Sequence, residues 1–190
     1  MSSTLRILAL AVVAAWESAR ADPPLYHLGR PATDADFAAA GISVGADGRG
    51  LPTGGATARE GRPLYESICS SCHGRHGEGN EPYPALAGGQ NTLKGAHPIL
   101  TIGSYWPYAT TVWDYINRAM PYQNPGTLTT QQVYALTAYL LYLNKIVGER
   151  LFVSQRTLPL IRMPNRNGFV ADPRPDVREN RHRGNPEQLQ

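Results

Sequence analysis

The chain contains only two cysteines, which lie close together and are followed directly by a histidine. The segment ESICSSCHGRHGEG holds Cys69, Cys72 and His73. A disulfide between Cys69 and Cys72 would close a very small loop and would stabilise the chain little. A thioredoxin-type dithiol is expected after a strand in a βαβ pattern, and no such pattern precedes Cys69. A zinc site would need further ligands, and the chain has no second cysteine pair.

The pattern C-x-x-C-H is the sequence at which c-type haem is attached to proteins. The thiols of Cys69 and Cys72 would form thioethers with the two vinyl groups of the porphyrin, whose separation matches the two-residue spacing. His73 would then lie beneath the iron as its proximal ligand. We therefore predict one covalently bound haem c, and a disulfide or a redox-active thiol pair is the alternative.

A methionine is the expected second ligand of the iron. Apart from the first residue, the chain has two methionines, Met120 and Met163, and each precedes a proline. Met120 lies just before the last strong helix pattern, where small class I cytochromes c, which this chain resembles in layout, carry their methionine ligand. Met163 falls beyond that helix and is interpreted as a packing or loop residue. We predict Met120 as the sixth ligand, with Met163 as the alternative.

Histidine is the other residue type that could supply the sixth ligand. The candidates are His27, His76 and His97. His76 is too close to His73 to reach the opposite face of the haem easily, and a surface position is the simpler interpretation of all three. Two protein ligands would leave no vacant position on the iron, and a methionine ligand raises the reduction potential. We therefore expect electron transfer rather than catalysis; an enzyme that binds substrate on the iron in place of the methionine is the alternative.

The first 21 residues are typical of a cleaved secretory signal. Arg6 precedes an apolar run over residues 7–16, and the small-residue pattern ARA follows at residues 19–21. We expect a periplasmic chain that begins near Asp22, and a retained N-terminal anchor is the competing interpretation. The mature chain has no further apolar run of the roughly 18 residues that a membrane span needs. The formal net charge of +3 is too small to indicate nucleic-acid binding.

Three segments have helical patterns. They are expected at about residues 57–69, where the helix runs into Cys69, at 109–119, and at 129–144. Pro121 would end the second helix, and a threonine would cap the third. The stretch between residues 79 and 107 is rich in glycine and proline and is expected to be a loop along the haem edge.

The first and last helices are expected to cross, as they do in class I cytochromes. Gly61 could provide the close approach that such a crossing requires, because glycine has no side chain. Tyr65 and Tyr139 are the expected aromatic partners at the crossing.

Several segments together resemble the cytochrome subunit of the Sox sulfane dehydrogenase and its single-haem relatives. They are LGRPATDADFAAAGISVGADGRGLPTGG, CSSCHGRHGEG, LAGGQNTL, TIGSYWPYATTVWDYINRAMPYQNPGTLT, VYALTAYLLYLNKIV and LPLIRMPNRNGF. The resemblance implies an all-α class I cytochrome c fold, with about three to four helices around one covalently bound haem and long irregular N- and C-terminal extensions. The expected divisions of the chain are a signal peptide (1–21), an N-terminal extension (22–56), a cytochrome c domain (57–147) and a C-terminal extension (148–190).

The resemblance also implies a function, because these cytochromes partner a molybdenum-containing subunit of the sulfite oxidase family. A sulfur compound would be oxidised at molybdenum, and electrons would pass one at a time through this haem to a downstream cytochrome c. Cys69 and Cys72 would hold the porphyrin, and His73 and Met120 would ligate the iron. Many Sox cytochrome subunits have two haem domains, whereas this chain has one haem motif, so a sulfite dehydrogenase or another molybdenum enzyme is the alternative partner.

The flanks at residues 28–55 and 158–169 are expected to embrace the partner, because an isolated electron carrier would not need them. A soluble carrier without a permanent molybdenum partner is the competing function. Trp106, Tyr108 and Arg118 could donate hydrogen bonds to the haem propionates, although packing and surface exposure explain them equally well.

Overall fold

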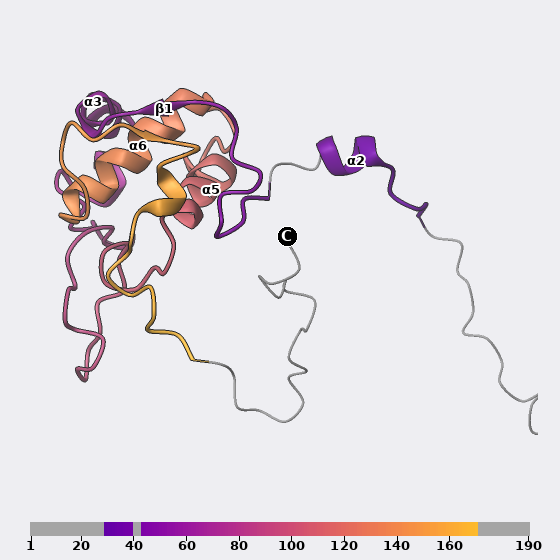
Figure 1. The fold of residues 1–190 in the computed structure, drawn as a ribbon. Coiled ribbons are helices and arrows are strands. Elements are labelled where there is room, and N and C mark those ends of the chain that lie inside the picture. Colours follow the sequence, from indigo (N-terminus) through magenta and orange to yellow (C-terminus); the bar gives the residue numbers. More distant parts are fainter. Residues whose placement is uncertain (1–28, 40–42, 171–190) are drawn as a thin grey trace, which may run out of the picture. The chain divides into compact units, whose positions relative to one another are not determined.

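The structure of the chain is a computed structural model that describes residues 29–39 and 43–170 (Figure 1). The predicted signal peptide, His27 and the chain after residue 170 lie outside the described residues. The chain divides into two units, residues 1–40 and 41–190.

The described part of the first unit holds one short helix, α2 (Asp34–Ala39), where the sequence predicted an irregular extension. The backbone N–H of Thr33 donates to the Asp36 carboxylate over 2.8 Å, and the Asp36 N–H donates back to the Thr33 hydroxyl over 3.3 Å. Arg30 also pairs with Asp36, and its guanidinium, together with Thr33, holds the pKa of that carboxyl well below its usual range. These contacts satisfy backbone donors that every helix start leaves free.

The second unit contains the haem motif and the predicted helices. In chain order its helices are α3 (Ala58–Ile68), α4 (Ser70–His73), α5 (Ala109–Ala119), α6 (Thr130–Leu143) and the 3-10 helix η1 (Leu158–Leu160). Thr57 with Glu60 and Thr129 with Gln132 form capping boxes at the starts of α3 and α6. The structure confirms the three predicted helices, and α5 ends at Ala119, with Met120 as its C-cap directly before Pro121.

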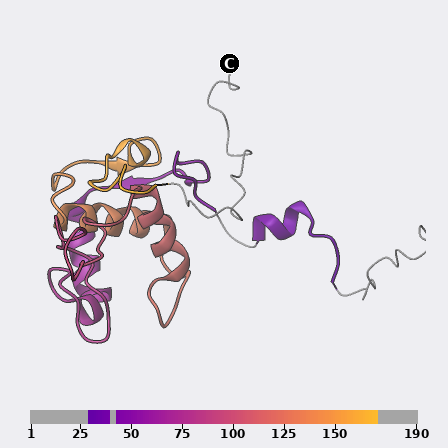
Figure 2. The same ribbon diagram turned by 90° about the horizontal axis from the view of Figure 1, so that it is seen from below.

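Helices α3 and α6 cross closely, as predicted (Figures 1 and 2). A Cβ atom at Gly61 would collide with the carbonyl oxygen of Ala135, so the two backbones can approach only because residue 61 is glycine. The rings of Tyr65 and Tyr139 pack beside this contact, with centroids 5.2 Å apart and planes inclined by 52°. The crossing fixes the end of α3 from which the haem motif continues.

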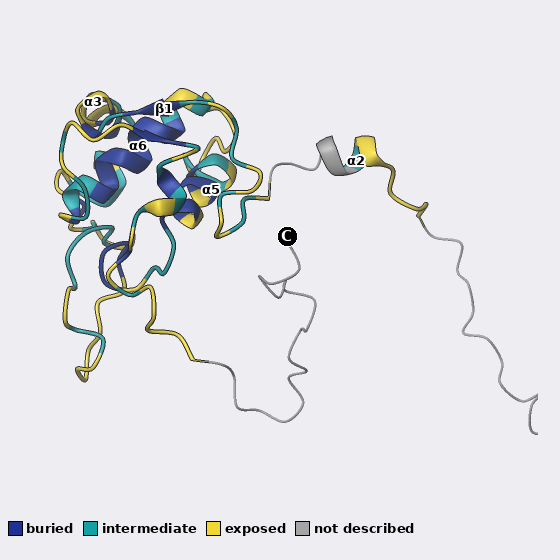
Figure 3. Ribbon diagram, in the orientation of Figure 1, coloured by how far each residue is buried: buried dark blue, intermediate teal, exposed yellow. Residues whose placement is uncertain are grey.

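Helix α6 is covered on every side along its middle, residues 133–141, all of which are buried (Figure 3). Besides α3 and α5, a two-stranded ladder contacts it. Strand β1 (Gly55–Ala56) pairs antiparallel with β2 (Val153–Ser154), and Gly55 lies opposite Ser154. This ladder, which the all-α expectation did not include, explains why α6 is apolar all round. Neither α6 nor any other helix within residues 29–39 and 43–170 is long and apolar enough to cross a membrane.

The segment after α6 is irregular in backbone, but part of it belongs to the core. Leu158 and Met163 are 0% and 1% exposed and lie in the same hydrophobic cluster as α6. On the N-terminal side, the hydroxyl of Tyr134 donates to the Pro52 carbonyl over 2.8 Å. The flanks of the helical domain therefore cover α6 and contribute to the stability of the unit.

Candidate functional site

The haem motif forms its own short helical turn between α3 and the following loop. Cys69 is the C-cap of α3, and the backbone N–H groups of Cys72 and His73 donate to its carbonyl over 3.2 and 2.9 Å. Residues three apart on such a turn share one face. Both cysteines are unpaired and half-buried, so two thiols lie one turn apart at the surface of the core.

The environment of Cys69 disfavours thiol redox chemistry. Burial, and to a lesser extent Cys72, raises the pKa of the Cys69 thiol to about 11. Reactive dithiols instead have lowered pKa values, because the thiolate is the nucleophile. Cys69 therefore lacks the electrostatics of a thioredoxin-type nucleophile, and its environment suits a thiol that becomes a thioether.

His73 has one ring nitrogen engaged and the other available. Its Nδ1–H donates to the carbonyl oxygen of Pro84 over 2.9 Å. Pro84 belongs to a loop that folds back on itself, because the N–H groups of Leu86 and Ala87 both donate to the Gly77 carbonyl over 2.7 and 2.9 Å. A backbone acceptor on Nδ1 fixes the tautomer and leaves Nε2 as the metal-binding nitrogen.

Tyr65 connects the helix crossing to this motif. Its hydroxyl donates to the carbonyl oxygen of Gly74, directly after His73, over 2.8 Å. Burial raises the pKa of Tyr65 strongly, so the hydroxyl keeps its proton and remains a donor. The packing of α3 on α6 therefore positions the residue next to the histidine as well as the start of the motif.

The two methionines differ in their surroundings. Met120 is half-buried at the end of α5, where it packs against the edge of the core and its backbone N–H donates to the Ile116 carbonyl. Met163 is 1% exposed and lies inside the hydrophobic cluster. Cys69 packs against the same cluster as Met120. The burial of Met163 supports its interpretation as a packing residue. The Met120 side chain, in contrast, is partly exposed to solvent.

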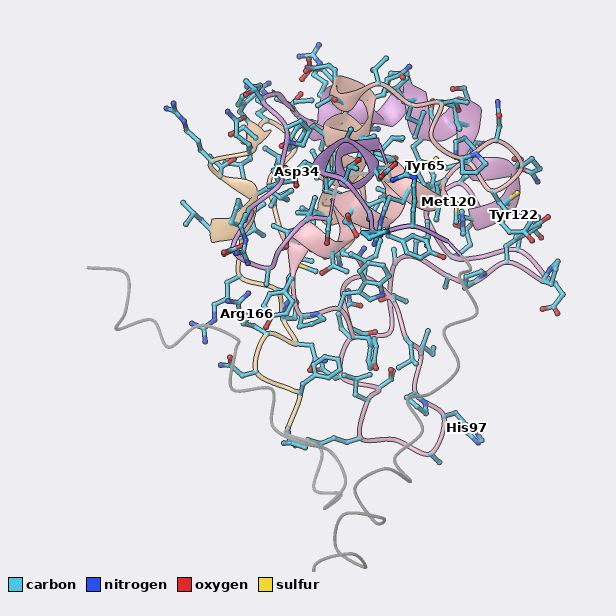
Figure 4. The ribbon with its side chains drawn as sticks, turned by 90° about the vertical axis from the view of Figure 1, so that its right-hand side faces the viewer. Asp34, Tyr65, His97, Met120, Tyr122 and Arg166 are labelled. Carbon is cyan, nitrogen blue, oxygen red and sulfur yellow. The ribbon has the colours of Figure 1, made fainter. Side chains whose placement is uncertain are left out.

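The other described histidines lie at the surface. His76 is exposed, and its backbone N–H donates to the carboxylate of Glu78 over 2.6 Å. His97 is exposed on a loop that projects away from the helices carrying Tyr65 and Met120 (Figure 4). Within residues 29–39 and 43–170 there is no group of three or more His, Cys, Asp or Glu side chains that could hold a metal ion.

The side chains considered for propionate binding are engaged with protein groups. The Trp106 ring packs edge-on against the Tyr115 ring, with the ring centroids 5.7 Å apart. The Arg166 guanidinium lies over the Tyr108 ring at 4.2 Å. Arg118 donates to the Asp114 carboxylate over 2.5 Å, one helical turn away on α5. Each of these side chains thus has a structural role within the described residues.

Two positioning groups were not predicted from the sequence. One is the Pro84 carbonyl, because any residue has a carbonyl and residue type does not reveal its direction. The other is Asn144, at the end of α6, whose amide donates to the carbonyls of Leu86 and Leu140 over 3.0 and 2.9 Å. A buried asparagine at a helix end signals such a bridge, although it does not name the loop that is bridged.

The arrangement of Cys69, Cys72 and His73 therefore fits a covalently attached haem: two free thiols lie one turn apart, and an imidazole with only Nε2 free follows them. Comparison with known proteins agrees with this chemistry. The family model for cytochrome c matches residues 58–144. A search of curated proteins gave no significant match.

One solved structure supports the same assignment over more of the chain. It is the crystal structure of the sulfane dehydrogenase SoxCD from Paracoccus pantotrophus, with a TM-score of 0.73 and 38% sequence identity. The match covers 81% of this chain and 76% of the chain in that structure. On these grounds the chain belongs to the cytochrome c family, as an electron-transfer protein with covalently bound haem c.

Proposed function

We propose that the chain is a periplasmic mono-haem cytochrome c that accepts electrons from a separate molybdenum-containing subunit of a sulfite or sulfane dehydrogenase and passes them to a downstream cytochrome c. The observation that carries this proposal is the 38% identity to a chain of SoxCD, a sulfane dehydrogenase. That match covers 81% of the chain, whereas the general cytochrome c model matches residues 58–144 only. The likeness thus extends into the flanks, which the general model does not include.

In this proposal Cys69 and Cys72 would hold the porphyrin, and His73 and Met120 would ligate the iron. The bound haem supplies one iron that alternates between its ferrous and ferric states. The protein keeps the imidazole in one orientation through the Pro84 carbonyl. A backbone acceptor on Nδ1 also raises the basicity of the imidazole and would so tune the iron. With His73 and Met120 as ligands, the iron would have no vacant position for substrate, so the chain would carry electrons.

The proposed partner would meet the side chains that the flanks leave exposed. Leu158 and Met163 are buried in the chain's own core and therefore cannot contact a partner. Leu160 and Phe169, from the same flank, are 79% and 52% exposed. A stable subunit interface is larger and more apolar than a transient electron-transfer contact. Exposed apolar side chains on this flank therefore support a lasting partner over a freely diffusing carrier.

The test is the molybdenum-to-iron ratio of the full chain, purified gently from its native periplasm through a C-terminal tag. Near-equimolar molybdenum, with haem reduction on addition of sulfite or a sulfane-sulfur compound, is the expected result. Iron without molybdenum, from cells that express molybdenum enzymes, would contradict the proposal and favour the free carrier.

A further inference from the structure

We propose that two segments, residues 94–105 and 159–170, form one docking surface for the electron-donating subunit, and that the matching surface of that subunit is acidic with an apolar centre. This inference rests on the proposed function. The two segments are called the basic apolar surface below.

Side-chain contacts join the two segments although they are far apart in sequence. The Asn165 amide donates to the Tyr105 carbonyl over 2.7 Å, and the rings of Tyr105 and Phe169 meet edge-on at 5.2 Å. Next to them, Tyr108 forms an isolated β-bridge with Arg162. The segments therefore present a single surface, and part of it, with Arg166 and His97 labelled, is seen in Figure 4.

Large apolar side chains are exposed on both segments. The exposed fractions are 49% for Ile99, 52% for Leu100, 79% for Leu160 and 52% for Phe169. A soluble protein rarely gathers exposed apolar side chains without a binding role. Burying them against a partner would be favourable, because apolar area removed from water drives association.

The charges on the same surface have one sign. No acidic residue occurs between Glu81 and Asp114, or between Glu149 and Asp172. Lys94, Arg162 and Arg166 are exposed, and none of them takes part in a salt bridge among the described residues. Cations without local counter-charges fit an acidic partner, and such complementarity sets both orientation and association rate.

A shallow cavity on the C-terminal segment has the same chemistry. It has a volume of about 250 Å³ and is lined by Pro159, Leu160, Ile161, Arg162, Arg166 and Asn167. A lining that combines apolar residues with two arginines suits a carboxylate-bearing side chain that buries its methylenes and pairs its charge. The cavity thus favours the same acidic and apolar partner as the exposed side chains.

Hydrogen bonds connect the basic apolar surface to the loop that holds His73. The Ile102 N–H and the Asn144 amide both donate to the Leu86 carbonyl, over 3.3 and 3.0 Å. Two residues earlier, the Pro84 carbonyl accepts from His73. A subunit bound to the basic apolar surface would therefore contact residues that are hydrogen-bonded, through Ile102, to the loop that holds His73, which is a suitable place for electron entry.

The experiment uses the full chain with a C-terminal tag, purified from the native periplasm, and measures molybdenum per haem iron. The variant is Lys94→Glu with Arg162→Glu, and Leu160→Ser tests the apolar part separately. The matched control is Arg59→Glu with Arg75→Glu, since both of these arginines are exposed but lie outside the surface. All variants are compared by their haem spectra, so that a folding defect is recognised.

We expect molybdenum per iron to fall at least tenfold in the Lys94/Arg162 variant and in Leu160→Ser, while the control matches the wild type. Retained molybdenum in both surface variants would overturn the docking surface but leave the proposed function intact. Absence of molybdenum from the wild type would overturn the proposed function and, with it, this inference. A change in self-association alone, with molybdenum per iron unchanged, would make the surface a contact between copies of the chain and would also overturn the proposal.

Discussion

The Nδ1 atom of His73 lies 2.9 Å from the carbonyl oxygen of Pro84, and this contact determines which imidazole nitrogen is free for a metal. The proline ring fixes the backbone φ angle of residue 84 and so limits the direction of its carbonyl. Pro84→Gly should let the carbonyl move and weaken the hydrogen bond. We expect faster solvent exchange of the His73 Nδ1 proton by NMR and a higher reduction potential, because a weaker acceptor makes the ligand less electron-donating.

Pro98→Gly is the matched control for this prediction, since Pro98 is exposed on the loop that carries His97. It should change neither the exchange rate nor the potential. Equal effects of the two substitutions would show that the Pro84 carbonyl has no special role.

The helix crossing gives a second prediction. Gly61→Ala should destabilise the protein by about 3 kcal/mol, at the upper end of the range for overpacked positions, because the new Cβ meets the Ala135 backbone oxygen rather than a movable side chain. The free energy of unfolding is measured by urea denaturation. Gly148→Ala is the control, as nothing lies within 4 Å of a Cβ at that position, and it should change stability by less than about 0.5 kcal/mol.

The capping box of α3 predicts a pH dependence. Hydrogen bonds from the Thr57 hydroxyl and backbone N–H lower the pKa of Glu60 below its ordinary value of 4.5. A lowered folded-state pKa adds stability above pH 4.5, and this stability is lost as the pH falls through the folded-state value. Glu60→Gln should therefore unfold with a weaker dependence on pH in this acid range than the wild type does.

Thr57→Ala distinguishes the stability that the N-cap hydroxyl of α3 provides from the stability that the Glu60 charge provides. It should cost about 1 kcal/mol at neutral pH, because it removes an N-cap side chain, and it should also weaken the acid dependence. A wild-type acid profile identical to that of Glu60→Gln would contradict the assignment.

The C-terminal flank should contribute to the stability of the helical domain. Leu158→Ala is expected to destabilise it by about 2–5 kcal/mol, the usual cost of truncating a buried leucine, since Leu158 is 0% exposed. Leu160→Ala, two residues away and 79% exposed, should be within about 0.5 kcal/mol of the wild type. Thermal or urea unfolding measures both, and equal small effects would mean that the flank is not part of the core.

Much of the helical domain could be predicted because local signals specify it. Helix α5 has the predicted bounds and ends at Ala119, with Met120 as its C-cap directly before Pro121. Thr129 caps α6, because a short polar side chain can accept a hydrogen bond from the first turn of a helix. Gly61 identified the crossing with α6 because only a residue without a side chain allows such an approach. The cysteine spacing and His73 then identified the cofactor.

Features that depend on distant backbone contacts could not be predicted in the same way. The pairing of Gly55 with Ser154 involves strands of two residues each, which are too short to give a periodic pattern. Leu158 is buried although its segment has no helical or strand pattern in the sequence. The hydrogen bond from His73 to Pro84 ends on a backbone carbonyl, whose position no residue type reports.

The identity of the axial ligand tests the account most directly, and the measurement is the absorption spectrum of the ferric protein with and without cyanide. The wild type should be low-spin with a methionine–iron charge-transfer band. Met120→Ala should lose that band, bind cyanide readily and have a lower potential, whereas Met163→Leu, a volume-conserving change at a buried position, should keep the wild-type spectrum. A high-spin wild type, or loss of the band in Met163→Leu but not in Met120→Ala, would contradict the account of this chain as a six-coordinate electron carrier.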